Sequence, residues 1–196
     1  MRSPDRRARQ RLSLQERTDA ILAAATSAFT SGTYDEVSVA AVAHAAGASE
    51  ALVYKYFDNK AGLYTAVVRD QLERLARRQR EVVDQRPSHT LARDQVRVSI
   101  EAVLDHVKGL GVAWAAPFFT AASEPSGVED LRRTYRSHLV DGLVSQLHNP
   151  HERRAQLAIL GFLGFLGAAA QQWASDGCPD NDRAPLVHAA LARKHR

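Results

Sequence analysis

Apolar residues recur with helical spacing along most of the chain, and no alternating apolar and polar run is long enough to predict a β-strand. The first regular stripe lies in residues 14–31 and consists of Thr18, Ile21, Leu22, Ala25, Ala28 and Phe29. Gly32 follows as a predicted helix end. The hydrophobic pattern therefore predicts an all-α protein that begins with an amphipathic helix.

Residues 38–57 predict two short helices joined by a tight turn. Ser38 and Ser49 are good N-caps, because a serine hydroxyl can accept a hydrogen bond from a backbone N–H of the first turn. Gly47 is the left-handed residue expected at the end of the first short helix. Helices this short are unstable alone, so residues 14–31 are expected to complete a three-helix core. Such a unit typically places its second helix in the major groove of DNA.

The rest of the chain predicts five more helices, at about 61–84, 90–108, 128–147, 152–175 and 183–194. In the fourth of these, the fourteen residues from Leu157 to Ala170 are all apolar or glycine. A membrane span needs about eighteen to twenty such residues, so we expect a buried helix and no membrane partner. Glycines at 161, 164 and 167 fall on roughly one face, where another helix backbone can come close.

Charge is distributed unevenly along the 196 residues, whose net charge is +4. Residues 1–13 are rich in arginine, whereas residues 14–60 carry an excess of acidic side chains. The sequence therefore divides into a basic arm (1–13), a helix–turn–helix domain (14–60) and a helical body (61–196). The arm has two interpretations, a solvated tail or a segment that enters the minor groove of DNA. Its candidate DNA-binding residues are Arg6, Arg7, Arg9 and Arg11.

Cysteine content and the first residues of the chain limit the classes of protein to which the chain can belong. A single cysteine, Cys178, excludes a disulfide framework and most zinc sites within one subunit. We expect no metal and no cofactor. The polar, arginine-rich start carries no apolar segment of the kind found in a signal peptide, so a cytoplasmic location is expected.

The segment from about Leu14 to Val68 resembles the N-terminal domain of the tetracycline-repressor (TetR) family of bacterial transcription regulators. The matching positions are Gly32, Tyr34, Ser38, Val42, Ala43, Ala46, Gly47, Ala48, Ser49, Val53, Tyr54, Lys55, Tyr56, Phe57, Lys60 and Leu63. Two departures are Ala48, which replaces a usual valine, and Ala40, which stands where many members carry a polar or basic residue. The resemblance implies a DNA-binding head, a palindromic operator on double-stranded DNA, a homodimer and a small-molecule effector.

The candidate DNA-binding residues outside the arm are the caps and the outward positions of the helix–turn–helix: Ser38, Ser49, Glu50, Leu52, Tyr54, Lys55 and Lys60. Leu52 could contact a thymine methyl group or pack against the neighbouring helix. Lys60 lies in the first turn of a helix capped by Asn59, where the helix dipole disfavours a cation. A DNA phosphate near that helix end would explain a lysine there; the alternative is an exposed lysine of little effect.

The body supplies candidates for the ligand and the dimer. The candidate ligand-binding residues are the bulky or titratable ones: His106, Trp114, Phe118, Phe119, Tyr135, Phe162, Phe165 and Trp173. The resemblance implies a four-helix bundle between two subunits, built here from 128–147 and 152–175; the alternative is ordinary intrachain packing. The candidate interface residues are Leu139, Leu143, Leu157, Gly161, Gly164, Phe165 and Ala168.

These observations favour a sequence-specific transcriptional regulator, a repressor released by a small apolar or aromatic ligand. An enzyme is not expected, because the eight histidines are scattered and neither a metal-binding motif nor a glycine-rich phosphate loop is present. A third interpretation, a helical ligand-binding or scaffold protein without specific DNA readout, is supported by the acidic head and by Ala40.

Overall fold

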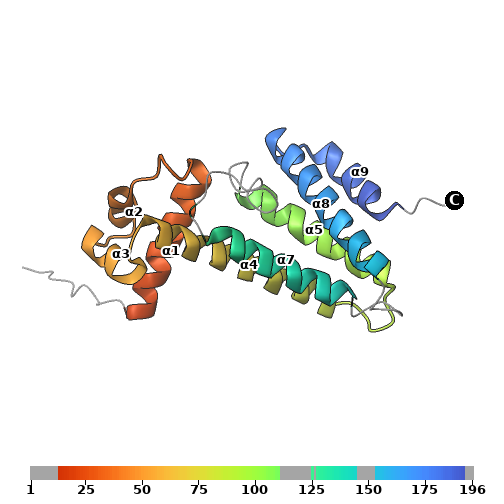
Figure 1. Ribbon diagram of the computed structural model, residues 1–196. Coiled ribbons are helices and arrows are strands. Elements are labelled where there is room, and N and C mark those ends of the chain that lie inside the picture. The colour runs from red at the N-terminus through yellow and green to blue at the C-terminus, as the bar shows by residue number, and fades with distance from the viewer. Residues whose placement is uncertain (1–12, 111–124, 126, 145–152, 193–196) are drawn as a thin grey trace, which may run out of the picture.

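The computed structural model describes residues 13–110, 125, 127–144 and 153–192. Regular structure in these ranges is entirely helical, which confirms the predicted all-α fold. The helices are α1 (Leu14–Ser31), α2 (Val39–Ala45), α3 (Glu50–Phe57), α4 (Lys60–Asp84), α5 (Ala92–Leu110), α7 (Val128–Val144), α8 (Arg153–Ser175) and α9 (Asp180–Leu191). In Figure 1, α1, α2 and α3 form a head at one end, and α4 runs from it along a body of α5, α7, α8 and α9.

The head forms where the serine caps and the glycine turn predicted it. The Ser38 hydroxyl accepts a hydrogen bond from the Ala41 N–H, and the Ser49 hydroxyl accepts one from the Leu52 N–H at 3.2 Å. Gly47 has a φ of 63°, in the left-handed region that glycine adopts without steric cost. These local signals fix α2 and α3 at a tight turn.

A buried core holds the three helices of the head together. From α1, the side chains of Ile21, Ala25 and Phe29 point inward, at the spacing of one helix face. They meet apolar side chains of α2 and α3, among them Val42 and Val53, each 1% exposed. Short helices become stable in this setting because each buries an apolar face against the other two.

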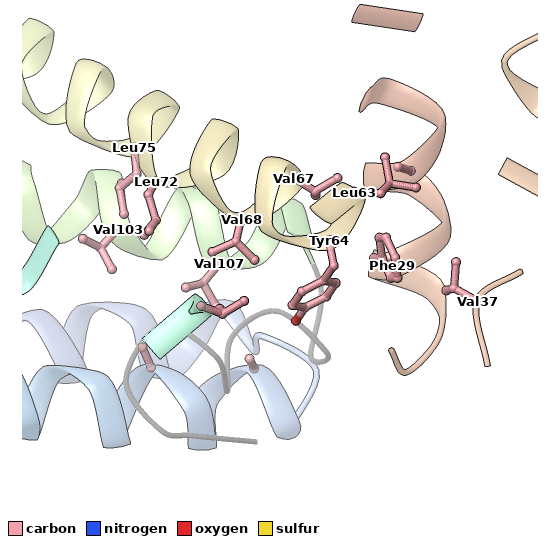
Figure 2. Close-up of a cluster of buried hydrophobic side chains, with 14 of the residues drawn as sticks. Phe29, Val37, Leu63, Tyr64, Val67, Val68, Leu72, Leu75, Val103 and Val107 are labelled. Carbon is pink, nitrogen blue, oxygen red and sulfur yellow. The ribbon is translucent and has the colours of Figure 1, made fainter. Parts of the chain in front are cut away.

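An aromatic cluster joins the head to the start of α4. The Phe29 ring contacts the Tyr64 ring edge-on, with centroids 4.9 Å apart, and Tyr34 packs edge-on against Tyr64 at 5.2 Å. Figure 2 shows Phe29 and Tyr64 facing each other across the gap between α1 and α4, with Leu63 beside them. Edge-to-face pairs at these distances are favourable, so α4 is packed firmly onto the head.

The connection between α3 and α4 is unusually tight. A Cβ atom at position 62 would lie 2.0 Å from the Phe57 carbonyl oxygen, so this position requires glycine. Asp58, at the end of α3, has a positive φ of 61°. The Asn59 side chain then caps α4 by accepting a hydrogen bond from the Gly62 N–H at 2.8 Å. The first turn of α4 is therefore held directly against the last turn of α3.

Helices α4 and α5 form the centre of the body. Leu72 and Leu75 of α4 face Val103 and Val107 of α5 in a continuous buried layer (Figure 2).

Helix α9 begins at Asp180, three residues before the predicted start. Its first turn is held by an ion pair from Lys108 Nζ to the Asp180 carboxylate at 2.7 Å, and an acidic residue there also suits the helix dipole.

Candidate functional site

Helix α3 presents a polar outer face. Its inward residues are Val53 and Phe57, which leaves Ser49, Glu50, Tyr54 and Lys55 exposed. The Tyr54 hydroxyl donates a hydrogen bond to the Glu50 carboxylate one turn earlier, and this bond raises the pKa of Tyr54. The face therefore offers a carboxylate, a phenol, a hydroxyl and an ammonium group, which suit hydrogen bonding to base edges and phosphates.

Leu52 lies at the edge of this outer face. The side chain is half-buried, and it is not among the apolar side chains packed against the core of the described residues. Contact with a thymine methyl group stays a prediction.

Lys60 contacts the head of its own subunit. Its ammonium group donates a hydrogen bond to the Asp35 carbonyl oxygen at 3.0 Å and lies 4.8 Å from the centre of the Tyr34 ring. Lys60 thus ties the loop before α2 to the first turn of α4. No pattern in the sequence predicts this contact, because 25 residues separate Lys60 from Asp35. Phosphate binding by Lys60 stays a prediction.

A mainly apolar cavity of about 100 Å³ lies in the body. It is enclosed by residues of four helices: Leu75, Gln79 and Val83 of α4, Gln95, Val96, Ser99, Ile100 and Val103 of α5, Tyr135, Leu139 and Leu143 of α7, and Phe162, Leu163 and Leu166 of α8. The Tyr135 hydroxyl and the Gln79 side-chain oxygen are 2.9 Å apart in a hydrogen bond. Burial raises the pKa of Tyr135, so the phenol is neutral and can donate this bond.

The cavity brings together some of the predicted ligand residues and excludes others. Tyr135 and Phe162 line it, whereas His106, Phe165 and Trp173 do not. The Trp173 indole N–H donates to the Pro179 carbonyl oxygen at 2.9 Å inside the core, and the Phe165 side chain is 45% exposed. Bulk and aromaticity identified candidates, but they could not indicate which side of each helix faces the cavity.

His106 lies on α5, outside the cavity. Its pKa is lowered from 6.5 to about 4, mainly by burial and in smaller part by the positive charge of Arg74. The imidazole is therefore neutral near pH 7, as expected for a histidine in a largely apolar setting.

Several predicted residues lie outside the described ranges. These are Arg6, Arg7, Arg9 and Arg11 of the arm, and Trp114, Phe118 and Phe119 of the body. Among the described residues, no group of three histidine, cysteine or acidic side chains is placed to hold a metal ion.

Helix α8 carries an exposed apolar stripe. Leu157, Leu160 and Phe165 are 55%, 49% and 45% exposed, and Gly161, Gly164 and Ala168 are also exposed on the same side of the helix. The candidates Leu139 and Leu143 lie elsewhere: they are half-buried in the cavity wall. Exposed apolar surfaces of this kind are typical of sites that contact another molecule.

The same helix is the only one in the described ranges that is long and apolar enough to cross a membrane, with a mean hydropathy of 1.4. Length and composition alone support that possibility, and core helices of water-soluble proteins pass the same test. The opposite side of α8 packs into the body through Leu163, Leu166 and Ala170.

Comparison with known proteins places the helix–turn–helix in a described family. Residues 21–67 match the family model for bacterial regulatory proteins of the tetR family. This match covers α2, α3, most of α1 and the beginning of α4. A search of curated proteins found no match.

Solved structures resemble the chain over nearly its full length. The fatty acid degradation regulator FadR of Bacillus halodurans is 16% identical, with a TM-score of 0.73 over 92% of this chain and 97% of that one. A tetR-family transcriptional regulator of Streptomyces coelicolor is 22% identical, with a TM-score of 0.73 over 91% and 80%. FadR of Bacillus subtilis, solved in complex with stearoyl-CoA, is 15% identical, with a TM-score of 0.72 over 90% and 99%. At these identities the likeness establishes the fold.

Proposed function

The chain is a member of the tetR family of bacterial regulatory proteins, and we propose that it is a homodimeric, sequence-specific transcriptional repressor released from DNA by a small apolar ligand. The observation that carries the proposal is the capped helix–turn–helix of α2, Gly47 and α3, with a polar face on α3 turned to solvent. Its site of action is chromosomal DNA, so we expect the protein to work in the cytoplasm.

DNA binding is assigned to the outer face of α3 and its surroundings. Glu50, Leu52, Tyr54 and Lys55 are proposed to contact base edges in the major groove, since they are the side chains that α3 does not turn into the core. Ser38, Ser49 and Lys60 lie at helix N-termini, where backbone N–H groups favour phosphate contacts.

The basic arm, residues 1–13, is proposed to add affinity for DNA. Residues 14–60 contain more acidic than basic side chains, whereas residues 1–13 contain five arginines and one aspartate. Attraction to phosphate therefore has to come largely from the arm and from Lys55 and Lys60. We propose that Arg6, Arg7, Arg9 and Arg11 supply it.

Dimerisation is assigned to the apolar stripe of α8. Leu157, Phe165 and their neighbours are exposed in the single subunit, and burying such side chains is favourable by about 25 cal/mol per Å². The glycines 161 and 164 have no other residue within 4 Å of a Cβ position, which leaves room for the backbone of a second helix. Two heads related by a two-fold axis would match a palindromic operator.

The effector is assigned to the cavity between α4, α5, α7 and α8. Leu75, Gln79 and Val83 of its wall belong to α4, the helix that is packed against the head through Tyr64. A ligand that changes the position of α4 would therefore move the head. The structural likeness to a FadR that binds stearoyl-CoA supports an apolar ligand with a polar end.

The test is selection from random duplex DNA at near-physiological salt with the full-length protein. Enrichment of an inverted repeat supports a dimeric, sequence-specific regulator and yields the operator. A reporter gene placed behind that operator then tests repression, which predicts lower expression when the protein is present. Enrichment of no sequence, with only weak salt-sensitive binding, would reject the proposal.

A second candidate function is a helical ligand-binding or scaffold protein that has lost specific DNA readout. The acidic balance of residues 14–60 and the alanine at position 40 favour it, since both weaken phosphate contacts. This candidate predicts ligand binding by the cavity without any preferred DNA sequence. The same selection experiment separates the two functions.

A further inference from the structure

A second hollow, of about 640 Å³, lies between α4 and α7 and opens to solvent beside the apolar cavity. It is lined by Arg69, Leu72, Glu73, Ala76, Arg77 and Arg80 of α4, and by Gly127, Asp130, Leu131, Thr134, Tyr135 and His138 of the α7 side. We call it the arginine groove. It differs in chemistry from the apolar cavity, which contains no charged side chain.

The arginines of the groove are available for an anion. Within the described part of the chain, Arg69, Arg77 and Arg80 form no ion pair. Of the two acidic residues in the groove, Asp130 already pairs with Arg133. The groove therefore carries a positive charge that its own side chains do not fully balance.

Tyr135 connects the groove to the cavity. Its ring lines both hollows, and its hydroxyl bonds to Gln79, which lines the cavity. Arg77 and Arg80 lie within one turn of Gln79 on α4. Arg69 lies ten residues before Gln79, or ~15 Å along the helix. Of the three arginines that line the groove, Arg77 and Arg80 are thus the closest along α4 to Gln79, the partner of Tyr135.

We infer that the effector is an amphipathic anion: its apolar chain enters the cavity, and its carboxylate or phosphate end lies in the groove against Arg77 and Arg80. The inference rests on the proposed effector function and adds the class of ligand. Guanidinium groups suit this role, because their planar N–H donors match the oxygens of a carboxylate or phosphate. The apolar cavity supplies the binding energy for the chain, whereas the groove selects for an anionic end.

The volume of the cavity is consistent with a chain of moderate length. A water molecule needs about 10–15 Å³ of such free space, and the cavity offers about 100 Å³. The space therefore holds several waters, and an aliphatic chain can replace them. Displacing water from a wall that is mainly leucine, valine and isoleucine is favourable, whereas burying the charged end there is not.

Isothermal titration calorimetry of the full chain with decanoate and with 1-decanol tests the inference. The two probes share a chain length, and only decanoate carries a negative charge. We expect the double variant Arg77→Gln, Arg80→Gln to bind decanoate about five- to tenfold more weakly and to bind decanol unchanged. The matched control is Arg78→Gln, because Arg78 is an exposed arginine of the same helix that pairs with Glu81 outside the groove.

A second variant tests the cavity independently of the groove. Ser99→Leu places a larger apolar side chain in the wall and is expected to weaken both probes. If the arginine variant binds decanoate as tightly as the wild-type protein while Ser99→Leu weakens both probes, the anionic subsite is refuted and the effector cavity stands. If the wild-type protein binds neither probe, the apolar effector function fails, and this inference fails with it.

Discussion

The head and the body are both helical, but they differ in how completely their side chains are packed. In the head, each short helix is capped by its own serine, and the inward side chains of Val42, Val53 and Phe29 are at most 2% exposed. The body encloses a cavity and leaves an apolar stripe of α8 uncovered. The core of the head is thus closely packed, whereas the body contains a cavity and an exposed apolar surface.

This difference fits the proposed function, a regulator that responds to a ligand. A reading head has to hold α3 rigidly, because base contacts depend on accurate placement. A body that responds to a ligand needs a loosely filled region whose packing the ligand can change. Helix α4 belongs to both regions, since Leu63 and Tyr64 pack in the head while Leu75 and Gln79 line the cavity.

The largest expected contrast concerns core packing. Phe29→Ala should lower the free energy of unfolding by about 3–5 kcal/mol, because it removes a buried ring from a closely packed core. Phe162→Ala should cost less than about 2 kcal/mol, because that ring is half-buried and already borders a void. Urea unfolding monitored by circular dichroism measures both. Equal losses would contradict the contrast between a filled head and an open body.

Acidification should weaken the body before the head. The pKa of His106 falls from 6.5 to about 4 on folding, so the unfolded chain binds the proton more tightly. Stability is then complete above pH 6.5 and is lost as the pH falls through 4, by about 3 kcal/mol in all.

Exposed carboxylates of the head lose their contribution to stability at lower pH. Hydrogen bonds from Ser13 and Thr33 hold the pKa values of Glu16 and Glu36 below 4.5, so their contributions persist above that pH and are lost as the pH falls through the lowered values. The free energy of unfolding, measured from pH 7 down to about pH 3 for the wild type and for His106→Gln, checks the order. A variant with the same pH dependence as wild type would show that His106 is not responsible.

Substitutions on the exposed apolar stripe of α8 test whether it holds two subunits together. Leu157→Glu should weaken dimerisation by about 2 kcal/mol or more, because it places a charge in an apolar contact. Leu91→Glu is the matched control, since Leu91 is 71% exposed and lies on neither the stripe nor the cavity wall. Analytical ultracentrifugation should find the first variant monomeric and the second unchanged. A wild-type protein that is monomeric at micromolar concentration would reject the assignment of the stripe.

The smallest expected effects are those of replacing Lys60 or Lys55, and the two substitutions should change DNA binding in different ways. Lys60→Ala should weaken binding of all DNA sequences alike by about 1 kcal/mol, because a phosphate contact carries no sequence information. It should also slightly destabilise the head, since it removes the bond to Asp35 and the contact with Tyr34. Lys55→Ala should instead change the preferred bases. Binding assays on the selected operator and on single-base variants distinguish these outcomes, and unaltered affinity in Lys60→Ala would leave that lysine a purely structural role.

Local sequence signals predict the helices of the head, the segment that matches the family model of tetR regulators. Ser38, Gly47 and Ser49 act within one turn of their own backbone, so their effect can be read from neighbouring positions alone. The stripe of Ile21, Ala25 and Phe29 likewise follows from helical spacing. The apolar character of 157–170 predicted a buried helix, although only one side of it is buried within the subunit.

The remaining features depend on how one helix is oriented against another, and they come from tertiary packing. It placed Leu139 and Leu143 in the cavity wall, turned Phe165 to solvent, and brought Lys60 to Asp35. It also set Gly62 against the Phe57 carbonyl oxygen, where no side chain fits. Periodicity defines the apolar face of a helix but not which neighbour covers it, because that choice depends on packing between segments far apart in the chain.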